Sequence, residues 1–236
     1  MSDIIEQVRR ELIINSDGTA KESGKRFFKE EVRSYGVKTM TVSRIAKQAF
    51  KIIEKLSKRE IFDLCEQLWI SGILEESFIA CNWAYTLRRQ YTEDDFILFE
   101  RWVASYVTNW ATCDTFCNHT IGAFLEMYPV HIEKLKDWTR SKNRWVRRAS
   151  AVSFIIPARK GLFKDDIFKI ADILLMDADD LVQKGYGWML KSLCAKYEDD
   201  VYLYVLGKRD IMPRTALRYA IEKMPEARKK EAMKRK

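Results

Sequence analysis

The chain has 236 residues, of which 47% are hydrophobic and 32% are charged, and its formal net charge is +8. This size allows one large domain or two small ones, and only nine glycines and four prolines exclude a disordered or collagen-like chain. No apolar run approaches the roughly 18 residues of a membrane span, so we expect no membrane partner. The five unevenly spaced cysteines are typical of reduced thiols in a cytoplasm.

Apolar residues recur at spacings of three and four along nearly the whole chain, and alternating segments bounded by turn residues are absent. This pattern predicts an all-α protein. Ser57 followed by Glu60 resembles a capping box, and short loops predict that consecutive helices pack antiparallel. The predicted helices span residues 2–14, 20–34, 41–56, 58–69, 74–90, 93–107, 110–127, 130–138, 143–157, 164–176, 179–196, 199–207, 213–223 and 225–234.

The positive charge is unevenly distributed along the chain. Residues 223–236 carry seven Lys or Arg against two Glu, and residues 138–160 carry seven against none. A basic tail of this kind is usually a solvated face, but residues 138–160 interleave their charges with Trp138 and Trp145 on a predicted helix. The distribution indicates a protein that meets a polyanion at a defined place.

A faint internal repeat is also present. The segment WVRRASAVSF from Trp145 aligns with LVQKGYGWML from Leu181, so that Arg148 falls over Lys184 and small residues fall at matching positions. Helix pairs that recur every 35 to 40 residues predict a right-handed α-solenoid of HEAT-like antiparallel pairs, although any helical bundle yields some matches. The second helices would form a concave face that residues 144–160 make basic. We expect one domain over residues 1–236 with a basic tail at about 225–236.

Motifs that need a special backbone are missing, since the sequence has no GxGxxG, P-loop, GxSxG or HExxH. Cys113, Cys117 and His119 form C-x3-C-x-H, but no fourth ligand is evident and cysteines that pack between helices are the favoured interpretation. With His119 and His131 as the only histidines, a Ser/His or Cys/His nucleophile is disfavoured. We expect neither a metal nor an organic cofactor.

The most suggestive constellation is Trp110 and Asp114, which lie one helical turn apart and are followed at about one period each by Arg148 and Trp188. In one interpretation Asp114 pairs with Arg148 and the tryptophans pack between repeats. In the other, these residues form a polar pocket with aromatic walls, which suits a cationic group or a transition state that develops positive charge. Beside a basic face, the natural cationic target is an alkylated base or its deoxyribose in DNA.

Several segments resemble one known family in order and spacing. NWATCD at 109–114, NRWVRRASA at 143–151 and QKGYGWMLK at 183–191 are similar to the DNA alkylation repair family of HEAT-like-repeat DNA glycosylases, the AlkD-like proteins. The likeness includes YGVKTMTVSRIAK from Tyr35 and LWISGILEESFIACNWA from Leu68, and it covers most of residues 25–222.

The resemblance implies excision of N3- and N7-alkylated purines from double-stranded DNA, with Trp110, Asp114 and Trp188 as the catalytic residues and Arg148 at a DNA phosphate. Phe27 departs from the Tyr of family relatives, which removes a hydroxyl contact near the lesion strand. We expect further DNA contacts on the basic face from Arg144, Trp145, Arg147 and Lys184. The expected protein is a cytoplasmic monomer that is nucleoid-associated when bound to DNA. The alternative is a non-catalytic HEAT-type module that binds unusual DNA or a protein partner.

Overall fold

The computed structural model describes residues 2–234, and within them the chain is helical apart from turns, loops and one isolated bridge between Arg33 and Ile73. The chain divides into two compact units, Met1–Phe116 and Cys117–Lys236. Among residues 2–234 no helix combines the length and the apolar character needed to cross a bilayer. The prediction of an all-α protein is confirmed.

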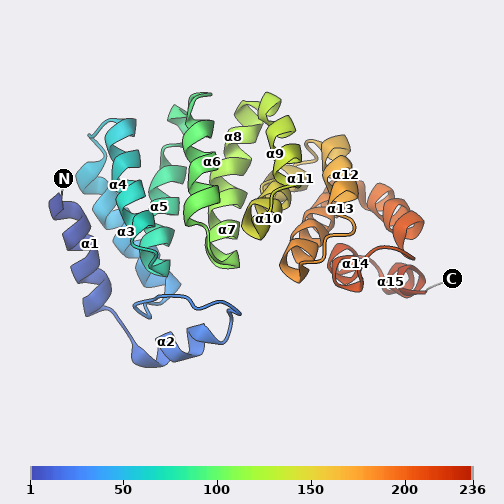
Figure 1. Cartoon of the computed structure of the whole chain (residues 1–236), viewed down its shortest axis with the longest axis horizontal. Helices are drawn as coiled ribbons and strands as arrows, with labels where there is room; N and C mark the ends of the chain where they lie inside the picture. Colours follow the sequence, from blue (N-terminus) through green and yellow to red (C-terminus); the bar gives the residue numbers. More distant parts are fainter. Residues whose placement is uncertain (1, 235–236) are drawn as a thin grey trace. The chain divides into compact units, whose positions relative to one another are not determined.

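In the first unit, α3, α5 and α7 are neighbours, and α4 packs on both α5 and α6 (Figure 1). Its centre is an aromatic cluster in which Trp69, Trp102 and Phe116 are fully buried and meet at centroid distances of 5.7 to 6.4 Å. The elements are α1 (Ser2–Ile14), α2 (Gly18–Lys25), α3 (Thr39–Ile53), α4 (Lys58–Ile70), α5 (Leu74–Thr86), the 3-10 turn η1 (Arg88–Gln90), α6 (Asp95–Tyr106) and α7 (Trp110–Phe116).

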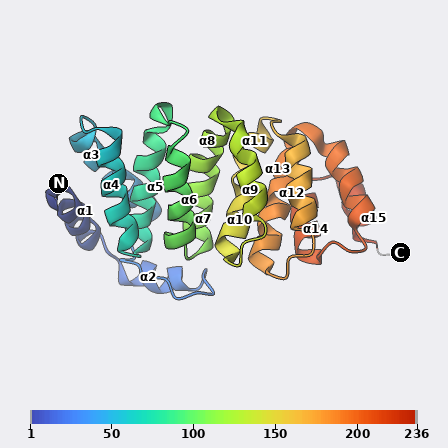
Figure 2. The same ribbon diagram turned by 45° about the horizontal axis from the view of Figure 1, so that its top comes forward.

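In the second unit, α13 packs against α10, α11, α12 and α14 (Figure 2). The elements are the π turn η2 (Cys117–Ile121), α8 (Gly122–Met127), the 3-10 turn η3 (Pro129–His131), α9 (Ile132–Trp138), α10 (Arg144–Val152), α11 (Ile155–Arg159), α12 (Lys164–Ile173), α13 (Asp180–Lys208), α14 (Arg214–Ile221) and α15 (Glu226–Met233). The last helix covers most of the predicted basic tail, whose residues 235–236 lie outside the described residues.

The small residues of the sequence repeat lie where these helices approach most closely. A Cβ on Gly185 of α13 would lie 3.3 Å from Cγ of Arg148 on α10. A Cβ on Gly187 would lie only 2.7 Å from the carbonyl oxygen of Ala216 on α14, closer than side chains tolerate. The small residues therefore allow α13 to pack closely on side chains of α10 and on the backbone of α14.

The aligned segments also make the same hydrogen bond one repeat apart. Arg147 Nη1 donates to the carbonyl of Ser141 at 2.9 Å, and Gln183 Nε2 donates to the carbonyl of Asp177 at 2.7 Å. Both acceptors lie two residues before the N-cap of the following helix, α10 or α13. The repeat in the sequence is thus matched by equivalent local bonding.

The predicted helix at 20–34 is right only to residue 25, because α2 ends at Lys25 and the chain then runs as a loop to α3. The cause is tertiary. The buried carboxylate of Glu75 accepts a hydrogen bond from the Ser34 hydroxyl at 2.8 Å and bonds from the backbone N–H groups of the next three residues at 2.8 to 3.0 Å, which fixes the end of the loop in a non-helical conformation. The backbone donors are Tyr35, Gly36 and Val37.

Two other boundaries differ for local reasons. The predicted helix at 143–157 is divided after Val152, because Pro157 has no N–H to donate to the carbonyl of Ser153. The predicted helices at 179–196 and 199–207 are continuous in α13 except for a non-helical Tyr197, with φ −137° and ψ 51°. The capping box at Ser57 and Glu60 is confirmed.

Candidate functional site

Trp110 begins α7 and is fixed by the loop that follows α2. Its indole Nε1 donates to the backbone carbonyl of Phe27 at 3.1 Å. Its ring stacks on Phe28, with centroids 5.4 Å apart and planes inclined by 25°. The side chain of Asn109 accepts from the N–H of Thr112 at 2.9 Å, which satisfies a donor in the first turn of the helix. Trp110 therefore has a defined orientation, with Phe28 against one ring face.

The loop that carries Phe28 is itself anchored to α5 by two buried acids. Besides the bonds of Glu75, Glu76 accepts from the Tyr35 hydroxyl at 2.7 Å and from Nη2 of Arg9 at 3.2 Å. Burial, and then the hydrogen bond to Glu76, raises the pKa of Tyr35, so its hydroxyl stays a donor. The acids hold the loop in place beside Trp110.

Sequence reasoning missed the roles of Phe28 and of these acids. Glu75 and Glu76 occupy the first turn of α5, where acids are common, and they are 2% and 0% exposed. The available signal was the position of two consecutive acids at the start of an otherwise apolar helix, since such residues are buried only when they are paired. Their partners lie 38 to 67 residues away in the chain, which no local pattern reveals.

Asp114 lies one turn after Trp110 on α7 and is 9% exposed. The helical spacing therefore brings the indole and the carboxylate to the same side of one short helix, as expected from the sequence. A carboxylate that is largely withdrawn from water acts on a nearby cation more strongly than one in bulk solvent. Trp110 and Asp114 both belong to the first unit, and the other two residues of the predicted constellation belong to the second.

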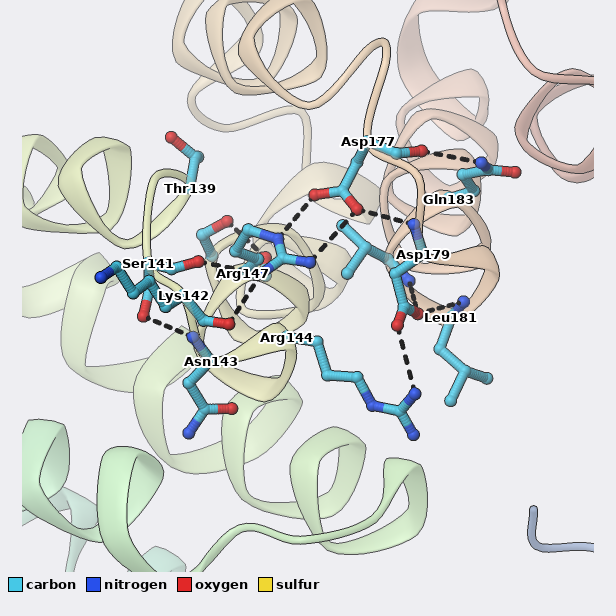
Figure 3. A network of polar contacts seen from close by, with 12 residues as sticks. Thr139, Ser141, Lys142, Asn143, Arg144, Arg147, Asp177, Asp179, Leu181 and Gln183 are labelled. Carbon is cyan, nitrogen blue, oxygen red and sulfur yellow. Dashed lines mark hydrogen bonds and ion pairs between the residues drawn. The ribbon is translucent and has the colours of Figure 1, made fainter. Parts of the chain in front are cut away.

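The basic segment 138–160 lies in the second unit. Figure 3 shows that two of its arginines, Arg144 and Arg147, form ion pairs with aspartates of the same unit. Arg147 Nε lies 2.6 Å from Oδ2 of Asp177, and its Nη1 donates to the carbonyls of Ser141 and Lys142 at 2.9 and 3.2 Å. With its side chain 20% exposed, Arg147 clamps the turn before α10 to the turn before α13. This residue has a structural role that the charge pattern does not reveal.

Arg144 and Trp145 form the first turn of α10. Arg144 Nη1 lies 3.2 Å from Oδ2 of Asp179, the residue that caps α13 (Figure 3). The Arg144 guanidinium also lies 4.7 Å from the centre of the Trp145 ring, a cation–π contact. Arg144 thus joins the start of α10 to the start of α13 and lies over the Trp145 ring on its own helix.

Arg148 is 5% exposed and its Nη1 donates to the carbonyl of Leu181, in the first turn of α13. Its aliphatic part borders Gly185 of the same helix. Lys184, the repeat equivalent of Arg148, lies 3.1 Å from Asp180 one turn earlier. The phosphate contact expected of Arg148 stays a prediction, and the structure adds a bond that ties α10 to α13.

Trp188 lies one turn after Lys184 on α13 and is partly buried. The predicted constellation is thus divided, with Trp110 and Asp114 in the first unit and Arg148 and Trp188 in the second. Arg148 lies on α10 and Trp188 on α13, and the assignment of all four residues to one site stays a prediction.

The described residues offer little other catalytic chemistry. Within residues 2–234 no group of three His, Cys, Asp or Glu is placed to hold a metal ion, and the five cysteines form no disulfide. Desolvation lowers the pKa of His119, so its imidazole is neutral at pH 7. A neutral imidazole is a poor source of a proton for a leaving group.

Comparison with known proteins agrees with this picture. The family model described as DNA alkylation repair enzyme matches residues 8–224. The solved structure titled "Predicted DNA alkylation repair enzyme from Enterococcus faecalis" is similar in fold, with a TM-score of 0.79, 14% sequence identity and coverage of 90% of this chain and 98% of that one. No curated protein matches the sequence. The family match over most of its length shows that the chain belongs to the DNA alkylation repair enzyme family.

Proposed function

We propose that this protein is a DNA glycosylase that hydrolyses the N-glycosidic bond of cationic N3- and N7-alkylated purines in duplex DNA. The family membership supports a role in the repair of alkylated DNA, with DNA as the substrate. The single observation that carries the finer proposal is the Trp110 and Asp114 pair on α7, an oriented indole one turn from a 9% exposed carboxylate. We propose that the protein acts as a monomer and without a metal or cofactor.

The mechanism follows from the charge of the substrate. An N3- or N7-alkylpurine is already positive, so the base leaves as a neutral molecule when the C1′–N bond breaks, and no general acid is needed. The positive charge passes to the deoxyribose, which becomes oxocarbenium-like. The Asp114 carboxylate stabilises that charge and orients the water whose oxygen bonds to C1′, while the proton lost by the water passes to solvent.

The aromatic residues recognise the cation. Indole faces attract cations by about 0.5 to 2 kcal/mol each, and we assign both Trp110 and Trp188 to contacts with the cationic nucleotide. Because Phe28 covers one face of Trp110, the other face is the one assigned to the lesion. In this proposal the site recognises the positive charge of the lesion and needs no deep pocket for the base.

We further propose that the helix pairs form HEAT-like repeats and that their second helices present a concave, DNA-facing surface. The recurrent bonds of Arg147 and Gln183 and the close approach of α10, α13 and α14 support a regular repeat. Arg148, which lies on a second helix, is assigned to a backbone phosphate in addition to its bond with Leu181.

The test is release of free 7-methylguanine from methylated duplex DNA by the purified protein and by its Asp114→Asn variant. We expect excision by the wild type, and at least a hundredfold slower excision by the variant, with affinity for plain duplex within a few fold, because the amide keeps the shape and removes the charge. The same rate in both proteins would remove Asp114 from the mechanism. DNA binding without any base release would favour the non-catalytic alternative.

A further inference from the structure

The exposed face of α3 carries a row of cations that neither the proposed mechanism nor the basic segment 138–160 includes. Between residues 38 and 58 the sequence has six Lys or Arg and one acidic residue, Glu54. Arg44, Lys47 and Lys51 recur at spacings of three and four, so they share one side of the helix, and all three are exposed. We name these three residues the α3 stripe.

The cations of the α3 stripe have no acidic partner in the described part of the chain. Within residues 2–234 no acidic side chain forms an ion pair with any of its members, and Arg44 donates only to the neutral side chain of Gln48, at 2.9 Å. Several other helices pair a cation with an acid one turn away, as in Glu6 with Arg9, Arg59 with Asp63, Glu133 with Lys136 and Asp180 with Lys184, and the α3 stripe places in succession on one helix face three cations that are unpaired within the described residues.

Like charges one turn apart repel one another and disfavour the helix, so the α3 stripe lowers the stability of the free protein. A solvated face needs no such arrangement, since acids interspersed with the lysines would keep it soluble. A ligand with a row of negative charges would remove the repulsion on binding. The rise of 1.5 Å per residue spreads the stripe over about 10 Å, which matches about three phosphates of one DNA strand at 3.4 Å of axis each.

The neighbouring side chains fit the same ligand. Met40, Ser43 and Gln48 lie on the same helix face and, with the α3 stripe, line a shallow hollow of about 530 Å³. Ser and Gln donate hydrogen bonds to phosphate and sugar oxygens, and Met40, which is 88% exposed, offers an apolar contact to a sugar or groove edge. The surface thus combines charge, hydrogen-bond donors and an apolar contact.

We infer that the α3 stripe binds the phosphate backbone of one DNA strand and supplies a larger share of the electrostatic attraction than the arginines of α10. This inference rests on the proposed function in taking DNA as the ligand. The α10 arginines already bond to Asp177, Asp179 and backbone carbonyls, whereas the cations of the stripe have no acid to leave.

The experiment compares the wild type with two triple variants that each remove three positive charges. The first is Arg44→Gln with Lys47→Gln and Lys51→Gln. The control is Arg89→Gln with Lys134→Gln and Lys196→Gln, which alters three cations that are exposed in the same way, lie on other elements and form no ion pair in the described chain. The measurement is the dissociation constant for a plain duplex from about 50 to 300 mM KCl, together with the melting temperature.

We expect the stripe variant to lose two to three units of the slope of log K against log salt and to bind at least about tenfold more weakly at 100 mM, with an equal or higher melting temperature. The control should keep the wild-type slope to within one unit. Two results would overturn the inference. One is a wild-type slope in the stripe variant, which would mean that the stripe binds an acidic protein partner or only solvent. The other is an equal loss of slope in the control. Wild-type protein that binds DNA with this pattern but releases no 7-methylguanine would contradict the glycosylase proposal alone.

Discussion

The cations of α10 and those of α3 look alike in the sequence and differ in the structure. Arg144, Arg147 and Arg148 are bonded to Asp179, Asp177 and the carbonyl of Leu181, so they hold two helices together. The α3 stripe is exposed and has no acidic partner within the described residues. A count of charges therefore identifies basic segments, but the partners of each cation decide whether it is available to a polyanion.

The largest effect should follow from breaking the α10 clamp with Arg147→Ala. The variant leaves Asp177 and two carbonyls without their donor, which we expect to cost about 3 kcal/mol of unfolding free energy, or about 6 to 12 °C in melting temperature. The salt dependence of DNA binding should not change. Lys142→Ala, an exposed neighbour without an ion pair, is the control and should melt like the wild type. A stable variant with a shallower salt slope would make Arg147 a DNA contact instead.

Arg148→Ala sharpens the comparison because we assign this residue two roles. Loss of its bond to the Leu181 carbonyl should cost about 1 to 3 kcal/mol of stability. Loss of a phosphate contact should make the salt slope shallower by about one unit, equally for plain and lesion-bearing DNA. Both are read from thermal melting and a binding titration. A destabilised variant with an unchanged slope would leave Arg148 with the structural role only.

Phe28→Ala asks whether the loop of the first unit serves Trp110. The stacked pair is worth about 0.5 to 1.5 kcal/mol, so excision of 7-methylguanine should fall by up to about tenfold while plain-DNA affinity stays within twofold. Phe28→Tyr should restore the rate. Phe27→Ala is the matched control, because the bond from Trp110 uses the backbone carbonyl of Phe27. Equal losses in both alanine variants would point to the loop as a whole.

The smallest effect is expected at the C-terminus. Arg228 of α15 already lies 2.6 Å from Asp199 and 2.9 Å from Glu198, and the helix is outside the segments that we propose contact DNA. The double variant Lys230→Gln with Lys234→Gln should therefore change the salt slope by less than about half a unit. A loss of a full unit or more in the same titration would move part of the DNA contact to this helix.

Most helices could be predicted from the sequence because the apolar residues at helical spacing are the ones that the fold buries. The Trp110 and Asp114 pair could be predicted because four residues make about one helical turn. Sequence reasoning could not predict the loop at 26–34, where the segment reads as helical but its end is held from another helix, because buried Glu75 accepts from the Ser34 hydroxyl and from the backbone of the next three residues. The ion pairs of Arg144 and Arg147 on α10 could not be predicted for the same reason, since their acids lie 30 to 35 residues further along the chain.

The α3 stripe was missed although its composition is visible. Its three residues are among six Lys or Arg that lie between apolar residues over 38–58, and they look like the outer face of an ordinary amphipathic helix. Only the contacts of each side chain show that the stripe has no acid beside it. The same contacts show that Arg147, which looks like a DNA ligand in the sequence, is used inside the fold.

The central claim is that the site acts on positive charge, and a panel of lesions in otherwise identical duplexes tests it most directly. We expect release of 3-methyladenine and 7-methylguanine, and no release of the neutral bases hypoxanthine and 1,N6-ethenoadenine, which need a proton to leave. His119 is neutral at pH 7 and supplies no such acid. Robust release of hypoxanthine by the wild-type protein would contradict the account, because it would demand a general acid and recognition of an uncharged base.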